Sequence, residues 1–307
     1  MPDRKILVAD DIENRTDAGK LRSQAIGHTA SFLAQRLRTG IDLLYVEDVK
    51  TYPVGKLDAS RFPAWHADHE ERLAEAAGQF SVPATCSLKS GSPVEEILKA
   101  IRSRPSPELV VVGTRGQKGV KRLFMGSVAE EVIRYSRRPV VVIGPAARKN
   151  FRELSGRKQL KLLVPTDLGK NSRAAERYAL SLARRTGAKV MLFHCPWDSI
   201  NAIIVNTAYS GTAAYGLGAV IDRSREDAVE ALQRKAGFFQ KHGVPCDYQI
   251  EEKALTSLCA VYQESGSGYA FVVMGTHGRN ALLTAFLGST ARETIMHAMV
   301  PVIIVHS

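Results

Sequence analysis

The chain has 307 residues, of which 45% are hydrophobic and 24% are charged, and its formal net charge at pH 7 is +11. This composition is typical of a soluble globular protein with a sizeable core, built as one large or two ordinary domains. No apolar run reaches the roughly 18 residues that a membrane-spanning helix requires, and the charged N-terminus lacks the apolar stretch of a signal peptide. These features exclude a membrane-spanning protein, and we expect a cytoplasmic location.

Cysteine usage and charge distribution narrow the chemistry further. The cysteines show neither a CxxC pair nor a zinc-like spacing, which favours buried, inert thiols in a reducing compartment and predicts no metal site. They are Cys86, Cys195, Cys246 and Cys259. Residues 101–150 hold 11 basic but only 3 acidic residues. This surplus suits a phosphate-bearing partner, either a nucleotide or a nucleic acid, although for charge alone a solvated basic face is the simpler interpretation.

Taken in chain order, the predicted elements alternate between strands and helices. The first strand ends on an aspartate, and helical patterns separate it from the strands that follow. In the first half the strands cover residues 6–10, 41–46, 109–113 and, after Pro139, 140–143. The segment 144–159 is rich in charge, glycine and alanine, and we predict a linker at residues 148–157 between domains 1–147 and 158–307.

The second half repeats this order. Its strands cover residues 162–167, 190–195, 271–275 and, after Pro301, 302–305, and the last two lie 162 positions beyond their counterparts. The chain is therefore predicted to be a tandem repeat. Near-continuous apolar strands separated by amphipathic helices predict, in each copy, a doubly wound open α/β sheet of parallel strands, with helices on both faces.

Both copies place Gly-x-x-Gly directly after a buried strand and Gly-Ser nine residues later, just before a predicted helix. These residues are Gly113, Gly116, Gly126 and Ser127 in the first copy, and Gly275, Gly278, Gly288 and Ser289 in the second. Glycine lets the backbone approach a ligand, and a helix start offers unpaired N–H groups and the positive end of the helix dipole. The pattern predicts a phosphate-binding loop in each copy. The alternative for Ser127 is a capping box with Glu130, which would stabilise the helix without a ligand.

Other nucleotide signatures are absent from the sequence. There is no GxxxxGK[ST] motif, which disfavours a P-loop protein, and no GxGxxG follows the first strand of either copy, which disfavours a dinucleotide-binding fold. His194 and His277 have no neighbour in the sequence arranged for proton transfer, so we expect packing or hydrogen-bonding roles for them.

The doubled Gly-x-x-Gly, nine residues, Gly-Ser motif resembles that of nucleotide-binding members of the universal stress protein family, and the resemblance covers nearly the whole chain. It implies an adenine nucleotide as ligand, namely ATP, ADP or AMP, with Mg²⁺ sharing the phosphate charge. The implied site residues of the second copy are Pro165, Thr166, Asp167, Cys195, Gly275, Gly278, Arg279, Gly288, Ser289 and Thr290. Those of the first copy are Ala9, Asp10, Val46, Gly113, Gly116, Gly126, Ser127 and Val128. By the same resemblance, Asp10 and Asp167 contact the ribose or adenine, and the backbone of Val46 or Cys195 contacts adenine.

The two copies differ near the expected ligand. Asp10 and Val46 lie 36 positions apart, whereas Asp167 and Cys195 lie 28 apart. We place the roughly eight extra residues of the first copy near residues 12–24, in the loop that would border the nucleotide. The acidic residues of that stretch, which repel phosphate unless a metal intervenes, are Asp11, Glu13 and Asp17. We therefore rank the second site above the first.

Three function classes remain open. A regulatory protein that senses ATP is favoured, and the family resemblance implies a link to stress. For an enzyme, no dedicated base, nucleophile or two-carboxylate metal site is identifiable, so we predict no catalytic residue and at most slow ATP hydrolysis. A nucleic-acid binder is disfavoured by the aromatic content of only 7%.

The third class comprises this nucleic-acid binder and an interaction scaffold without nucleotide. Strands 140–143 and 302–305 are apolar edges that we expect to pair with each other and to form a pseudo-two-fold within the chain. A homodimer and unidentified protein partners stay open. The apolar insertion at residues 201–220 fits a lid, a partner surface or a plain loop.

Overall fold

In the computed structural model, the described residues are 5–14, 16–48, 62–114, 125–154, 156, 159–197, 200–201, 205, 217–251, 257–266, 268–276 and 287–306. They fall into two compact units. Unit 1 comprises Met1–Arg157 and Ile295–His306, and unit 2 comprises Lys158–Thr294. None of the helices within the described ranges is long and apolar enough to cross a membrane.

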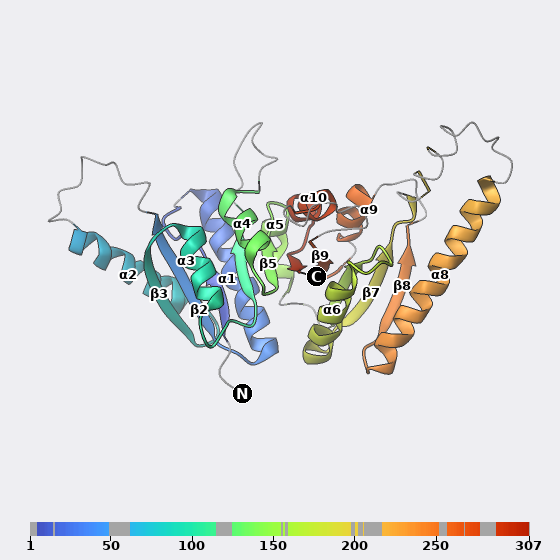
Figure 1. Cartoon of the computed structure of the whole chain (residues 1–307). Coiled ribbons are helices and arrows are strands. Elements are labelled where there is room, and N and C mark those ends of the chain that lie inside the picture. The colour runs from blue at the N-terminus through green and yellow to red at the C-terminus, as the bar shows by residue number, and fades with distance from the viewer. Residues whose placement is uncertain are drawn as a thin grey trace. The chain divides into compact units, whose positions relative to one another are not determined.

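Unit 1 is built on parallel strands in the order β3-β2-β1-β4-β5, with β10 added antiparallel to β5. Its elements are β1 (Ile6–Ala9), α1 (Asp17–Leu37), β2 (Ile41–Asp48), α2 (Phe62–Gly78), β3 (Ala84–Gly91), α3 (Pro93–Arg102), β4 (Val110–Gly113), α4 (Ser127–Tyr135), β5 (Val140–Ile143), α5 (Ala147–Asn150), the 3₁₀ turn η4 (Phe151–Leu154) and β10 (Val302–Val305). Strands β2 and β3 are added to the sheet on one side of β1, whereas β4 and β5 are added on its other side. Because parallel crossovers are right-handed, this reversal puts α1 and α2 on one face of the sheet and α3 and α4 on the other. Figure 1 shows α3 and α4 side by side, and the two helices contact each other.

Unit 2 has the same design, with parallel strands in the order β9-β6-β7-β8. Its elements are β6 (Lys161–Pro165), α6 (Arg173–Thr186), β7 (Lys189–His194), α8 (Leu217–Lys241), β8 (Cys246–Ile250), α9 (Ser257–Glu264), β9 (Phe271–Gly275) and α10 (Ser289–His297). The prediction of two tandem, doubly wound α/β repeats is therefore confirmed.

The cores lie along the central strands. Every residue of β1, β5 and β10 is buried, and only the last residue of β4 is partly exposed. Strands buried on both faces need apolar residues at every position, which is why these segments show no alternation in the sequence. The edge strand β3 is mostly exposed.

The last strands of the two repeats pair with each other, as predicted. The antiparallel ladder joins Val141 to Ile303, with Val142 opposite Val302 and Val140 opposite Ile304. Val141 and Ile303 are equivalent positions of the repeat, so the ladder has a local two-fold centred on that pair. The two apolar edges are thus occupied by one another.

The predicted linker contains ordered helical turns. Within it, α5 and η4 pack against α1, and the side chains of Phe151 and Leu154 are buried. Arg148 on α5 is buried as well, at 5% exposure. A segment that looks like a polar connector in the sequence thereby contributes apolar and charged side chains to the core of unit 1.

The position expected for the extra residues of the first copy is wrong. Seven residues separate strand from helix in both units, residues 10–16 in one and 166–172 in the other. The insertion instead lengthens the helix, because α1 has 21 residues and α6 has 14. Thr16 caps α1 by accepting a hydrogen bond from the Gly19 amide at 3.1 Å. The helix therefore begins as close to its strand as α6 does, and the extra residues lie within the helix.

Candidate functional site

The candidate site lies where strand order reverses. In open parallel sheets, ligands bind beyond the carboxyl ends of the strands at this switch point. It falls between β1 and β4 in unit 1, and between β6 and β9 in unit 2. Continuing the strand registers places Asp10 beside Gly113 and Thr166 beside Gly275. Both glycine motifs therefore begin at a switch point.

The registers also correct the expected match between the two copies. Asp10 stands at the position of Thr166, because their amides donate to equivalent carbonyls of the neighbouring strands, at 3.3 Å and 2.9 Å. The counterpart of Asp167 is consequently Asp11 rather than Asp10. The sequence comparison aligned the first aspartate after each strand, whereas the position of a residue is fixed by strand pairing.

Asp167 is held by its own loop through one carboxylate oxygen. Oδ1 accepts hydrogen bonds from the Gly169 amide at 2.8 Å and from the Ser172 hydroxyl, and Ser172 Oγ accepts from the Asp167 amide at 3.0 Å. The other oxygen, Oδ2, is buried and has no hydrogen-bond partner within the described part of the chain. A buried carboxylate oxygen without a donor is costly, so this atom is suited to accept a hydrogen bond from a ligand.

A buried polar network supports this loop from behind. The Thr166 hydroxyl donates to Glu176 Oε1 at 2.7 Å and accepts from the Leu168 amide at 3.0 Å. Lys235 of α8 binds the same Glu176 carboxylate at 2.8 Å and 2.6 Å. His194 is buried with Nδ1 2.8 Å from the Thr166 carbonyl oxygen, which confirms its expected hydrogen-bonding role. The residues around Asp167 therefore have fixed positions.

The predicted phosphate loop of unit 2 is partly described. The Gly288 amide donates to the Thr276 carbonyl at 2.8 Å, so it is already used within the protein. Ser289 and Thr290 stand in the first turn of α10, whose amides point out of the helix start. Gly278 and Arg279 lie outside the described residues, as does Gly116 of unit 1.

In unit 1, the helix α4 begins differently from the capping-box alternative. Gly126, with φ of 95°, is the N-cap, and it provides no side-chain hydrogen bond. Ser127 is therefore already inside the helix, followed by Val128, and the capping box with Glu130 is wrong. The loop before α4 thus ends one position earlier than the capping-box pattern suggests, at a residue whose positive φ favours glycine.

Two buried arginines occupy the switch point of unit 1. The Arg22 guanidinium lies 3.1 Å from Asp10 Oδ1, with the two side chains only 4% and 7% exposed, and it donates to the Asp11 carbonyl at 2.8 Å. Its stem covers Gly113, where an added Cβ would lie 2.7 Å from Arg22 Cγ. Arg148 donates to Thr114 Oγ1 at 3.0 Å.

These charges perturb one another. Burial raises the pKa of Asp10, and the Arg22 charge opposes this rise. Burial and the positive charge of Arg22 lower the pKa of Arg148 to about 10. Arg22 is therefore the guanidinium group paired with the buried Asp10 carboxylate, while Arg148 bonds to Thr114.

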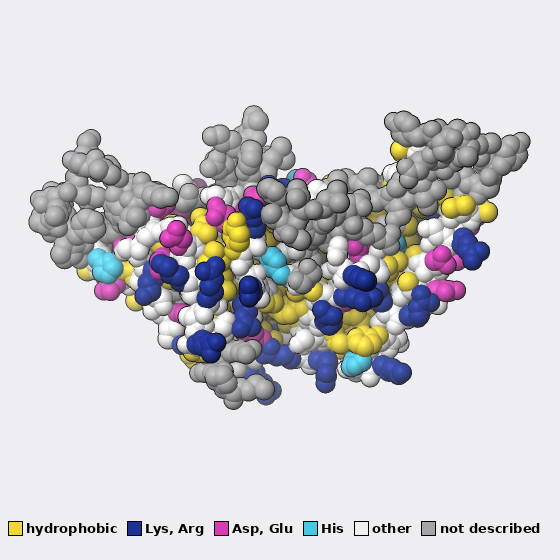
Figure 2. Space-filling view, viewed as in Figure 1, with side chains coloured by type: hydrophobic (Ala, Val, Ile, Leu, Met, Phe, Trp, Pro, Cys, Tyr) yellow, Lys and Arg dark blue, Asp and Glu magenta, His cyan; other side chains and the backbone are white. Residues whose placement is uncertain are grey.

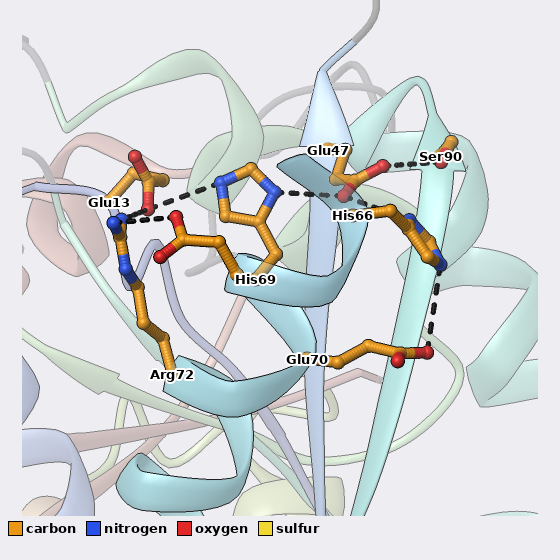
Figure 3. A network of polar contacts seen from close by, with 8 residues as sticks. Glu13, Glu47, His66, His69, Glu70, Arg72 and Ser90 are labelled. Carbon is orange, nitrogen blue, oxygen red and sulfur yellow. Dashed lines mark hydrogen bonds and ion pairs between the residues drawn. The ribbon is translucent and has the colours of Figure 1, made fainter. Parts of the chain in front are cut away.

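A second polar cluster fills the edge of unit 1 at the end of β2 (Figure 3). His69 of α2 is fully buried, and its Nδ1 lies 2.9 Å from Glu47 Oε1. The opposite ring nitrogen, Nε2, lies 3.2 Å from Oε1 of Glu13 in the loop after β1. Ser90 donates to Glu47 Oε2 at 2.7 Å, and Arg72 pairs with Glu13. The imidazole of His69 therefore bridges the loop after β1 and the end of β2.

Sequence reasoning missed this cluster. The available signals were a glutamate that directly follows the predicted second strand and two histidines, His66 and His69, three positions apart on a helix. Within the described ranges, no group of three or more His, Cys, Asp or Glu residues is arranged to hold a metal ion.

The remaining predicted positions lie near the strand ends. Ala9 and Pro165 end β1 and β6, Val46 lies in β2 at 9% exposure, and Cys195 is half-buried after β7. Of the other cysteines, Cys246 is buried, and burial raises the pKa of its thiol to about 12. Cys86 is exposed, so the expectation of buried thiols is wrong there, because Cys86 lies on the mostly exposed strand β3.

Among the described residues of the range 101–150, the exposed basic side chains do not form one cluster on α3 and α4. Exposed arginines include Arg102, Arg104 and Arg137. Figure 2 shows basic side chains over this face separated by uncharged and acidic ones. This distribution favours a solvated face over a continuous nucleic-acid surface.

Comparisons with known proteins agree with this architecture. The model of the universal stress protein family matches residues 3–144 and 160–306. A universal stress protein of Mycolicibacterium smegmatis is 24% identical over 206 residues, which cover 67% of this chain and 64% of that protein. Universal stress protein Rv2005c of Mycobacterium tuberculosis is 26% identical over 204 residues, 64% of this chain and 61% of that protein. The chain thus spans less than two thirds of the length of these relatives.

A crystal structure of a universal stress protein from Archaeoglobus fulgidus has the same fold, with a TM-score of 0.68 and 20% identity, and the match covers 100% of this chain and 99% of that one. With both repeats matched by the family model, the chain belongs to the universal stress protein family.

Proposed function

We propose that this protein binds an adenine nucleotide, ATP with Mg²⁺, at the strand-end edge of the second repeat, and that binding serves stress-linked regulation by changing shape or partners. The observation that carries the proposal is the buried Oδ2 of Asp167, which lacks a hydrogen-bond donor in the described part of the chain. A ribose hydroxyl is a donor of the right kind for this oxygen.

The other predicted residues supply complementary contacts. Gly275, at the end of β9, lets a ligand approach the backbone because no Cβ intervenes. The first turn of α10, at Ser289 and Thr290, offers amides and the positive end of a helix dipole to the phosphates. When bound with the nucleotide, Mg²⁺ neutralises phosphate charge. The backbone of Cys195 is the proposed contact for adenine.

The supporting network suits a binding site. Thr166, Glu176 and Lys235 form a continuous buried chain of hydrogen bonds from α8 to the loop that presents Asp167. A rigid loop loses little conformational entropy when the ligand arrives, which favours affinity. The two final strands are paired with each other as expected, so their facing edges are occupied and offer no support for pairing with another chain.

The proposal is tested by isothermal titration calorimetry of the full chain with ATP and Mg²⁺. The wild-type protein is expected to bind, and Asp167→Asn is expected to weaken binding at least tenfold, because an amide replaces half of the acceptor capacity of the carboxylate with a donor. Asp247→Asn, at an exposed position of β8, is the matched control and is expected to bind like the wild type. Undetectable binding to the wild type, or equal affinities of the two variants, would refute the proposal.

A further inference from the structure

We infer that only the second repeat takes a nucleotide, because in the first repeat the side chains of His69 and Arg22 fill the equivalent space from within. The inference rests on the proposed function and fixes its stoichiometry at one nucleotide per chain. It follows from comparing equivalent positions of the two repeats.

The first difference lies in the two loops that border the place of the base. The strand registers make Glu13 the counterpart of Gly169, and Glu47 the counterpart of Pro196. The second repeat therefore has a glycine and a proline where the first has two carboxylates. In the first repeat the ring of His69 joins these carboxylates, with contacts of 2.9 Å and 3.2 Å (Figure 3).

His69 is held too firmly to be displaced as a surface side chain would be. It has no solvent exposure, and both its ring nitrogens face carboxylate oxygens. Its ring also makes an edge contact with Tyr45, with the ring centroids 5.3 Å apart. Between the loop after β1 and the end of β2, a planar nitrogen heterocycle of the protein thus stands where a nucleotide base would have to enter.

The second difference concerns the place of the ribose. In the second repeat, Thr166 and Asp167 leave one buried acceptor without a donor. In the first repeat, Arg22 donates to Asp10 and to the Asp11 carbonyl, and its methylene stem lies over Gly113. The glycine face that a ligand would approach is therefore covered by the chain itself.

Opening the first site would break a buried ion pair and a buried histidine–carboxylate hydrogen bond at once. A nucleotide entering there must displace Arg22 from Asp10 and His69 from Glu47, and removing one partner of a buried ion pair is strongly unfavourable. In the second site the counterparts of the two carboxylates are Gly169 and Pro196, which form no ion pair, and the buried oxygen of Asp167 gains a donor when ligand binds. Both repeats carry the glycine motif, and in the second repeat the buried Oδ2 of Asp167 is available as an acceptor within the described part of the chain.

The experiment measures both the number and the location of bound nucleotides on the full chain. Calorimetry with ATP and Mg²⁺ is expected to give one equivalent per chain. Hydrogen exchange followed by mass spectrometry is expected to show slower exchange on ATP addition at residues 166–172 and 288–292, with no change at residues 9–14. The equivalent carboxylates provide a matched pair, in which Asp167→Asn loses at least tenfold in affinity and Asp11→Asn stays within twofold of the wild type.

The outcomes separate the two proposals. Two equivalents per chain, protection at residues 9–14, or a tenfold loss with Asp11→Asn would overturn the inference and leave the proposed function standing. A wild-type chain that binds no ATP would instead overturn the proposed function. One equivalent, with protection confined to the second repeat, supports both.

Discussion

Replacing Arg22 by methionine tests how the buried charges of the first repeat are arranged. Methionine keeps most of the stem that covers Gly113 but removes the guanidinium, so little packing is lost. Asp10 then stays in its buried position with its own loop and the more distant Arg148 charge as support. Because the ion pair has side-chain exposures of only 4% and 7%, its disruption is expected to cost about 3–5 kcal/mol of unfolding free energy at pH 7.5.

The cost is expected to depend on pH. Burial already raises the pKa of Asp10 above its ordinary 3.8 in the folded wild type, and removing Arg22 raises it further. A carboxyl group whose pKa is raised on folding favours the folded state at low pH, and this contribution is lost as pH rises through the folded-state pKa. The deficit of Arg22→Met should therefore be smaller at pH 5 than at pH 7.5.

Urea unfolding followed by circular dichroism at the two pH values measures both quantities. The double variant Asp10→Asn with Arg22→Met is the control, and it is expected to recover more than half of the lost stability because no buried carboxylate remains uncompensated. A deficit below about 1 kcal/mol at pH 7.5, in the range of an exposed pair, would show that the ion pair is not buried. A deficit that does not change with pH would show that Asp10 is not the group left without a partner.

Further substitutions test the loop support, the contact with the last helix and the helix caps. Glu176→Gln is expected to weaken ATP binding several-fold in calorimetry, less than Asp167→Asn, because Glu176 acts by positioning the loop; an effect as large as that of Asp167→Asn would contradict this indirect role. Gly144→Ala is expected to lower Tm by several degrees, because its Cβ would lie 1.8 Å from a backbone oxygen, whereas Gly237→Ala, with no atom within 4 Å, should not lower it. Thr16→Ala is expected to lower the free energy of unfolding by about 1 kcal/mol, because the N-cap of α1 is lost. Ser127→Ala should lower it far less, because Ser127 lies inside its helix. Equal losses of unfolding free energy for the two variants in urea would refute this placement of the caps.

The parts of the fold that the sequence predicts well are those in which backbone and burial leave few alternatives. The central strands of the parallel sheet must be apolar at every position, so apolar runs such as 140–143 and 302–305 can be recognised as strands from the sequence. The constant spacing between the equivalent final strands of the two halves reveals the repeat. Two apolar edge strands that lack a neighbour in the sequence pattern are then expected to pair with each other. Each of these features follows from local sequence and one rule of sheet packing.

The details around the candidate site were harder to predict for a physical reason. An insertion counted between two landmarks can extend a helix as easily as a loop, and only the cap at Thr16 decides that it extends α1. Likewise, the position of Asp10 depends on which strand residues are paired, and this is a long-range property. The contacts of His69 join three segments that are distant in sequence, so no local pattern reveals that they meet.

The shared glycine motif therefore indicates that the two repeats have a similar strand-to-helix turn. The chemistry at each switch point depends instead on side chains that other elements contribute. In unit 1 these are Arg22 of α1, His69 of α2 and Arg148 of α5, whose partners are Asp10, Glu47 and Thr114. In unit 2 the network from α6 and α8 holds Thr166, next to Asp167, whose Oδ2 has no hydrogen-bond partner among the described residues. A repeat can retain its glycines because a tight strand-to-helix turn needs them, even when its ligand position is filled. The buried Oδ2 of Asp167 is the acceptor on which our proposal for the second repeat rests, because it lacks a hydrogen-bond donor among the described residues.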